Sequence, residues 1–312
     1  MPTDLDTTKP IVPVPAPWKL KGDVYIATFF NKPGNLPEHA YSPLEKASSY
    51  ADPAVSGAHL GGLSQVQIIR YTDSPVGPYD ELIVCPGYYN YQVDDPKNPG
   101  KRLTKKNVRI SRIYVSQKYT CWNGRTNWNI PKHLARFTFT TNPADNSTTV
   151  EVFPHDTTAS SATPAPSSVS TESQPSTVPF FRATFYPQRF VPSFPFSLSW
   201  FTNFGLDIGI VQPPLPENKD AAQGEIPGTD RWCKINPNQS TRRATIGWID
   251  MQQKPDGVSG SSGSAQTTTS GQVEGCENFW PGMGRWQLAV KMEDAEIDFG
   301  HGTYWDAPKT ML

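Results

Sequence analysis

Short apolar segments of β-strand length recur along the chain from Trp18 onward. They are rich in aromatic and β-branched residues, which favour strands. The segment 107–120, NVRISRIYVSQKYT, alternates polar and apolar residues at the two-residue period of a half-buried strand. We therefore predict strands over 24–30, 64–72, 79–91, 107–120, 134–141 and 148–154.

The second half of the chain continues this pattern less regularly. Prolines interrupt the strand-like segment 180–200 and limit it to edges, bends or interrupted strands. The segment 284–306 contains one strand and a short amphipathic piece. Long helical windows rich in alanine and leucine are missing, and no internal repeat is present. The pattern therefore indicates short strands joined by loops.

Two polar tracts interrupt the strand pattern. Residues 157–178 include 12 Ser or Thr and no aromatic residue, and 12 of the 15 residues in 257–271 are Gly, Ser or Thr. Such tracts bury too little surface to offset the entropy of ordering them. Neither tract separates two self-sufficient patterns, so we interpret both as insertions into one domain, 18–312. A flexible, proline-rich lead-in, 1–17, precedes that domain.

Composition and charge exclude several classes of function. Lys and Arg total 28 against 29 Asp and Glu, and the resulting net charge of −1 provides no basic excess for nucleic acid. No apolar run approaches the roughly 18 residues of a membrane span. The acidic, proline-broken amino terminus lacks the profile of a secretory signal. We therefore expect a cytoplasmic protein with neither nucleic acid nor a membrane as partner.

Familiar catalytic and metal-binding motifs are missing from the sequence. It contains no GxSxG, P-loop, GxGxxG at a helix start, or HExxH. The histidines are scattered without metal-ligand spacing. The widely spaced cysteines include no CxxC pair, which indicates reduced, mostly buried thiols rather than a zinc site or disulfides.

Two segments carry candidate chemistry. In DSPVGPYDELIVCPG (73–87), a proline–glycine turn leads into an apolar strand that has Glu81 at its entrance. In GRTNWNIPKHLARF (124–137), Lys132 has apolar neighbours, and desolvation would lower its pKa and yield a nucleophilic amine. The alternatives remain open at this point. Glu81 can be a solvated strand-end carboxylate, and Lys132 can extend its ammonium group to water.

Taken together, these segments resemble the acetoacetate decarboxylase-like proteins, particularly divergent fungal-type members. APWKL (16–20) is similar to the family's amino-terminal Pro–aromatic–Lys stretch, and GPYDEL (77–82) to its Gly-x-Tyr-x-Glu motif. GRTNWNIPKH (124–133) has the family spacing of Gly-Arg, five residues and then Pro-Lys. Residues 16–140 carry most of the resemblance, and 284–300 is a weaker closing match.

The resemblance implies a fold and a mechanism. The fold would be α+β and mainly antiparallel β, a single curved sheet closing into a cone or barrel around an apolar pocket. Lys132 would project into that pocket near Glu81 and form a Schiff base with a ketone, while Glu81 would act as acid and base. The resulting iminium withdraws electrons during decarboxylation, and equally during an aldol addition, a dehydration or an isomerisation.

Two positions depart from the family pattern. His133 stands where the family has a second lysine, and an imidazole is cationic only part of the time near pH 7, so its effect on the pKa of Lys132 would be weaker. The family's amino-terminal arginine, which meets the substrate carboxylate, falls near Asp23. Simple decarboxylation of acetoacetate is therefore doubtful, although Arg70 or Arg125 could compensate from another strand.

The remaining candidate site residues are aromatic residues and two arginines that would bind the substrate. We expect Tyr79, Trp122 and Trp128 to contact an apolar substrate together with Arg70 and Arg125, because aromatic rings give a large contact surface. Most of the chain's other aromatic residues fit packing in a β core equally well.

Three hypotheses of function follow. The first is a small-molecule enzyme, in secondary metabolism, that acts on an apolar carbonyl substrate as a lyase, decarboxylase or aldol–dehydratase. The second is a non-covalent cyclase or pericyclase of a polyketide or terpenoid on the same scaffold, in which Glu81, Lys132 and His133 would be catalytic only through hydrogen bonds and charge. The third is a ligand-binding protein without catalysis. None of them requires a metal or an organic cofactor, and free strand edges leave a homo-oligomer open.

Overall fold

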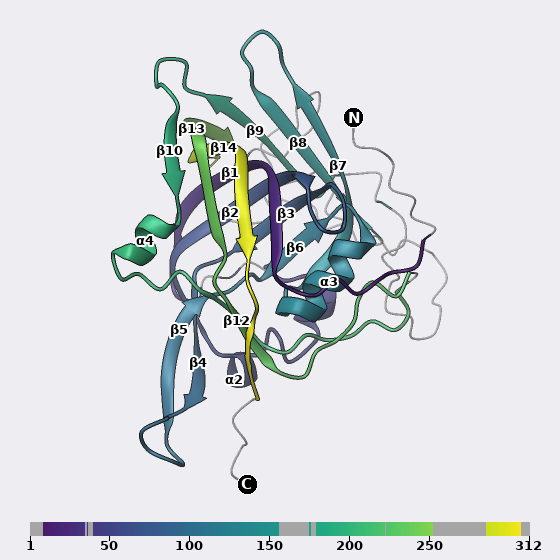
Figure 1. Cartoon of the computed structure of the whole chain (residues 1–312), viewed down its shortest axis with the longest axis vertical. Coiled ribbons are helices and arrows are strands. Elements are labelled where there is room, and N and C mark those ends of the chain that lie inside the picture. Colours follow the sequence, from purple (N-terminus) through teal and green to yellow (C-terminus); the bar gives the residue numbers. More distant parts are fainter. Residues whose placement is uncertain are drawn as a thin grey trace, which may run out of the picture.

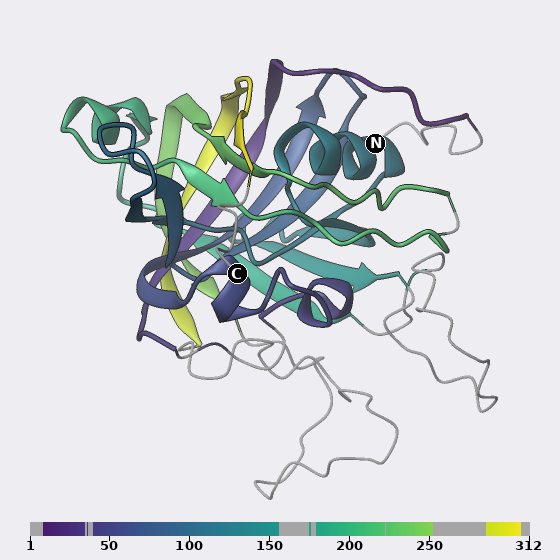
Figure 2. The ribbon, with the colours of Figure 1, turned by 90° about the horizontal axis from the view of Figure 1, so that it is seen from below.

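Strands are the main regular elements of the computed structural model, which describes residues 9–34, 36, 40–155, 175, 179–221, 223–251 and 285–306. Within these residues, nine strands pair in one closed ring, in the order β1-β14-β13-β9-β8-β7-β6-β3-β2 and back to β1 (Figures 1 and 2). The ring strands are β1 (Trp18–Asn31), β2 (His59–Asp73), β3 (Tyr79–Cys85), β6 (Arg112–Val115), β7 (Lys132–Thr141), β8 (Thr148–Pro154), β9 (Phe181–Pro187), β13 (Asn238–Asp250) and β14 (Trp286–Phe299).

Neighbouring ring strands are antiparallel, except that β6 and β7 are parallel. Parallel neighbours need a crossover connection, and helix α3 (Lys118–Trp128) provides it. The predicted fold class, mainly antiparallel β with a curved sheet that closes into a barrel, is therefore confirmed.

Further strands extend the sheet from β2, or pair with β13, and three short helices complete the described residues. From β2 the order continues through β4 (Tyr88–Asp94), β5 (Arg102–Val108), β11 (Ile210–Gln212), β12 (Trp232–Ile235) and β15 (Thr303–Trp305). The hairpin of β4 and β5 projects away from the barrel (Figure 1). The remaining elements are β10 (Phe194–Ser197), which pairs with β13, and the helices α1 (Pro43–Lys46), α2 (Pro53–Ser56) and α4 (Ser199–Asn203). Among the helices of the described residues, none is long and apolar enough to cross a lipid bilayer.

Two hydrophobic cores lie on opposite faces of the same strands. One core takes side chains from all nine ring strands, among them Tyr25, Tyr114 and Phe185, and fills the barrel. The other uses the alternate residues of β1, β2, β3, β6, β7 and β14, and joins the buried face of α3 and β12. A strand buried on both faces requires apolar residues at successive positions, which explains runs such as LIVC (82–85).

The predicted strands are confirmed in part. Single strands cover 24–30, 64–72, 134–141 and 148–154, while Pro86 and Gly87 divide 79–91 into β3 and β4. The predicted single strand over 107–120 is wrong: it comprises the end of β5, all of β6 and the first turn of α3. Segment 180–200 is interrupted as predicted, and 286–299 is one continuous strand.

Both predicted low-complexity insertions lie outside the described residues, except Pro175 within 157–178. Residues 9–17 of the predicted lead-in lie along α3. Asn123 of α3 accepts a hydrogen bond from the Val14 N–H (2.7 Å) and donates one to the Val12 carbonyl (3.1 Å), and Tyr119 donates one to the Lys9 carbonyl.

Candidate functional site

A small, closed cavity lies between α3 and the strands that bear the second core. Strand alternation brings every second residue of β3 to it, namely Tyr79, Glu81 and Ile83. The described residues that line it are Trp18, Leu20, Tyr71, Tyr79, Glu81, Ile83, Ile110, Ile113, Trp128, Ile130, Lys132 and Phe299. Only about 10 Å³ is open to the centre of a water molecule, which is room for about one water.

An ion pair between Lys132 and Glu81 occupies one wall of this cavity. Lys132 Nζ lies 2.7 Å from Glu81 Oε2, and the two side chains are only 4% and 2% exposed. Lys132 Nζ also donates a hydrogen bond to Thr120 Oγ1 of α3 at 2.9 Å and lies 5.1 Å from the centre of the Tyr79 ring. A buried lysine therefore has one counter-charge next to it, and the other groups around the pair are uncharged.

Two tyrosines complete the polar wall. Tyr71 donates a hydrogen bond to Glu81 Oε1 at 3.0 Å, and its ring centre lies 4.3 Å from that of Tyr79. Burial, reinforced by the negative charge of Glu81, raises the pKa of both phenols well above the usual 10. Both tyrosines therefore keep their protons near neutral pH, so Tyr71 is a hydrogen-bond donor beside the carboxylate.

The spacing of Gly-Arg, five residues and Pro-Lys has a direct structural basis. Gly124 faces Lys132 across the turn between α3 and β7, and a Cβ at Gly124 would lie 2.6 Å from Lys132 Cδ and 2.7 Å from Cε. α3 ends at Asn129, which adopts the left-handed conformation (φ 54°) and returns the chain into β7. Arg125 Nη1 then donates to the Lys132 carbonyl at 3.1 Å. The motif therefore clears the space for the lysine side chain and fixes its backbone.

On the opposite face of β7, Glu45 of α1 joins a second buried charge network. Its carboxylate lies 3.1 Å from Arg125 Nη1 and 2.6 Å from His133 Nε2. Burial alone would raise the pKa of Glu45, but His133 and Arg125 outweigh it and hold the pKa below its usual 4.5. This network ties α1, α3 and β7 together beside the candidate site, without lining the cavity.

The structure brings only some of the predicted site residues together. Lys132, Glu81, Tyr79 and Trp128 line the cavity. His133 does not, because successive residues of a strand point to opposite faces and its ring meets Glu45 instead. This placement also removes His133 as the charge that would act directly on the amine of Lys132.

The predicted arginines and Trp122 lie away from the cavity. Arg125 is fully buried, and its Nε, Nη1 and Nη2 donate to the Pro227 carbonyl, Glu45 and the Pro216 carbonyl. Arg70 is on the opposite face of β2 from Tyr71, 3.8 Å from Asp80 and half exposed. Trp122 is partly buried on α3 and does not line the cavity. Asp23 is also outside it and accepts from the Asp294 N–H.

Several lining or bonding residues had no assigned role in the sequence interpretation, and among them Tyr71, Trp18, Phe299 and Thr120 carry aromatic rings or hydroxyl groups. Trp18 packs edge-on against Trp128, with ring centres 5.1 Å apart, and Phe299 packs on the same indole at 5.3 Å. The alternation of the 64–72 strand could have indicated that Tyr71 shares a face with Ile69, but not that this face meets Glu81.

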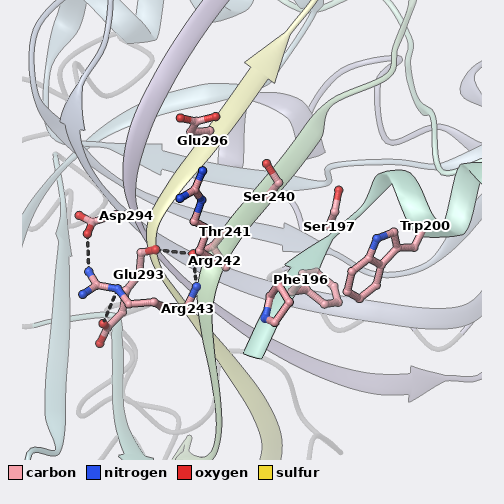
Figure 3. Close-up of a pocket in the computed structure, with 11 residues that line it drawn as sticks. Phe196, Ser197, Trp200, Ser240, Thr241, Arg242, Arg243, Glu293, Asp294 and Glu296 are labelled. Atoms are coloured by element: carbon pink, nitrogen blue, oxygen red, sulfur yellow. Dashed lines mark hydrogen bonds and ion pairs between the residues drawn. The ribbon is translucent and has the colours of Figure 1, made fainter. Parts of the chain in front are cut away.

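A larger hollow lies on the surface and has a different character. It is an open groove of about 460 Å³ between β10, α4, β13 and β14. Figure 3 shows Arg243 between Asp294 and Glu293, with Phe196 and Trp200 on the other side. Its charged groups face solvent, and Arg243 is paired with Glu293 and Asp294, so the buried Lys132–Glu81 pair is the stronger candidate for chemistry. Within the described part of the chain, no cluster of three or more His, Cys, Asp or Glu could hold a metal ion.

With this geometry established, the chain can be compared with known proteins. No protein-family model and no curated protein matches it. It is similar to the solved acetoacetate decarboxylase of Legionella pneumophila, with 10% identity over 93% of this chain and 88% of that chain and a TM-score of 0.47. A second acetoacetate decarboxylase structure gives 12% identity, coverages of 93% and 90% and a TM-score of 0.48. An acetoacetate decarboxylase-like enzyme from Sphingomonas wittichii RW1 is 10% identical over 94% of this chain and 94% of that chain, with a TM-score of 0.45. At these identities the similarities assign no role to any residue of this chain.

Proposed function

We propose that the protein is an enzyme that binds an apolar carbonyl compound in the α3 cavity and forms a Schiff base with Lys132. The observation that carries the proposal is the buried contact of 2.7 Å between Lys132 Nζ and Glu81 Oε2 in an apolar cavity. Buried titratable pairs in a cavity are frequent at catalytic sites. The motif resemblance around Gly124, Pro131 and Lys132 points to the same chemistry.

The proposed steps use only residues at the cavity. Glu81 takes a proton from the Lys132 ammonium group, and the neutral amine attacks the substrate carbonyl carbon. The nitrogen passes a second proton to the carbonyl oxygen, which becomes the hydroxyl of a carbinolamine. Glu81 then returns its proton to this hydroxyl, which leaves as water, so the products are an iminium that keeps one N–H, a water molecule and the Glu81 carboxylate. The iminium then withdraws electron density from the neighbouring carbon atoms. We assign the reaction to the lyase, aldol or dehydratase type, in small-molecule, secondary metabolism.

Substitution of Lys132 by alanine tests the covalent step. We expect Lys132→Ala to abolish both turnover of the substrate and the adduct trapped by cyanoborohydride from a small methyl ketone. Lys19→Ala is the matched control, because Lys19 is an exposed residue of β1 between the cavity residues Trp18 and Leu20. Peptide mass spectrometry locates the adduct. Full turnover by the alanine variant would disprove Schiff-base catalysis.

A second candidate function is a non-covalent cyclase or pericyclase. The same ion pair favours it, because Lys132 and Glu81 at 2.7 Å place a donor and an acceptor of opposite charge side by side at the cavity wall. Lys132, Glu81 and Tyr71 would then act on a bound chain through charge and hydrogen bonds, and orientation would provide the rate gain. Activity that persists in Lys132→Met but falls in Trp128→Ala would favour this function.

A further inference from the structure

We infer that the substrate of this cavity is an uncharged carbonyl compound, such as a ketone, an aldehyde or a keto ester, and not a keto acid. The inference rests on the proposed function and adds the substrate class. It follows from the charges at the cavity, where Lys132 and Glu81 are the only ionisable pair of opposite sign, and where every other lining residue described is apolar or a tyrosine.

The charge of the cavity is balanced before a substrate arrives. Lys132 and Glu81 neutralise each other at 2.7 Å. Formation of the Schiff base preserves this balance, because the iminium keeps the positive charge and the Glu81 carboxylate remains beside it. An uncharged substrate therefore leaves the site neutral, whereas a keto acid adds a carboxylate without a counter-charge.

None of the other buried cations among the described residues lines the cavity. Arg125 gives its donors to Glu45 and to the backbone carbonyls of Lys132, Pro216 and Pro227. Arg109 lies in a separate aromatic box, with its guanidinium 4.2 Å from the Tyr89 ring centre and 5.7 Å from that of Trp232, and neither ring lines the cavity. Among the described residues, no third charge is placed to receive a substrate carboxylate.

The energetic consequence is large. An unpaired carboxylate taken into an apolar site loses its hydration, which costs several kcal/mol even after the surroundings relax. The charge of Glu81 would add repulsion at short range. Tyr71 cannot compensate, because its one hydroxyl proton already goes to Glu81. The site therefore discriminates against anions by leaving them unpaired.

This substrate class narrows the reaction. Without a substrate carboxylate there is no carbon dioxide to release, so the iminium is left with aldol or retro-aldol chemistry, dehydration or isomerisation. In each of these a proton moves at the carbon next to the iminium. Glu81 is the base available at the cavity, and Tyr71 donates to the other oxygen of the same carboxylate.

Trapping with a matched pair of probes tests the inference. 4-Oxopentanoate and its methyl ester carry the same ketone and differ in charge, and neither loses carbon dioxide readily. We expect cyanoborohydride to fix the ester on Lys132 on the order of 100-fold faster than the acid, in line with several kcal/mol of desolvation. Glu81→Gln removes the cavity's negative charge. In this variant we expect the rate at which the acid labels Lys132 to come closer to the rate of the ester.

The possible results distinguish the substrate class from the proposed Schiff base at Lys132, on which it rests. Labelling of Lys132 by the acid at a rate equal to or above that of the ester would overturn the substrate class and leave the Schiff base intact. Labelling by neither probe, in a folded wild-type protein, would overturn both. An unchanged ratio in Glu81→Gln would also contradict the charge argument, because it would show that the cavity's own carboxylate does not contribute to the selectivity.

Discussion

At the scale of single residues, the position of the Lys132 side chain depends on the absence of a Cβ atom at Gly124. Gly124 does not adopt a positive φ, so its backbone conformation does not require glycine. The constraint on this position is the space that the Lys132 side chain occupies. The atoms that a Cβ would meet belong to the flexible end of Lys132 rather than to backbone. A methyl group at Gly124 would therefore move the amine and not the helix.

We predict that Gly124→Ala impairs function while leaving the fold nearly unchanged. The displaced amine would lose its contact with Glu81, and misplacement by about 1 Å can lower a rate on the order of 100-fold. The rate of ketone trapping at Lys132 and the melting temperature measure the two effects. Gly300→Ala is the control, because a Cβ at Gly300 would meet nothing within 4 Å. Equal trapping rates in both variants would show that Lys132 does not need this space.

At the scale of elements, alternation along β3 and β7 decides which residues form the site. It places Glu81 and Lys132 on one face and Asp80 and His133 on the other. The side on which His133 lies could have been predicted from the sequence, since a strand beginning at Lys132 sends its second residue to the opposite face. The candidate pair itself, Lys132 and Glu81, was predictable from motif spacing, because both motifs are local.

Other elements could not be predicted from local pattern. α3 has the sequence KYTCWNGRTNW, which lacks a clear apolar stripe, and its stability comes from tertiary packing and from Gln117, whose side chain accepts from the Thr120 N–H. Tyr71 was missed for a similar reason. Its hydrogen bond to Glu81 depends on the register between β2 and β3, where Tyr71 pairs with Tyr79, and register is a long-range property.

The end of β14 is the part of the cavity lining that is closest to solvent. Phe299, its last residue, is the one lining residue among those described that is not buried. We predict that Phe299→Ala increases the trapping rate of a bulky ketone such as 4-phenyl-2-butanone several-fold, and that of acetone much less, because the closed cavity holds only about one water. Leu288→Ala is the control, since Leu288 is half exposed on the same strand. An unchanged preference between the two ketones would place the access route elsewhere.

At the scale of the whole molecule, the buried interior leaves little room for charge, and two of its carboxyl groups, Asp80 of β3 and Glu45 of α1, respond to pH in opposite ways. Burial raises the pKa of Asp80 from 3.8 to about 6, although Arg70 lowers it in part. Glu45 has a pKa below 4.5, because His133 and Arg125 outweigh its burial. The stability that Glu45 contributes is present above about pH 4.5 and is lost as the pH falls through its lowered pKa.

The effect of pH on the stability that depends on Asp80 has the opposite sign, and it can be measured. Between pH 3.8 and about 6 the folded protein holds a proton that the unfolded chain has released, so stability falls as the pH rises through this window. Asp80→Asn removes the penalty, and we expect it to increase the free energy of unfolding by up to roughly 3 kcal/mol above pH 6, at about 1.4 kcal/mol per pKa unit. Below pH 4 the gain should disappear. Urea unfolding at a series of pH values measures it, with the exposed Asp73→Asn as control. A gain of the same size at every pH would mean that Asp80 is destabilising through its packing rather than through its charge.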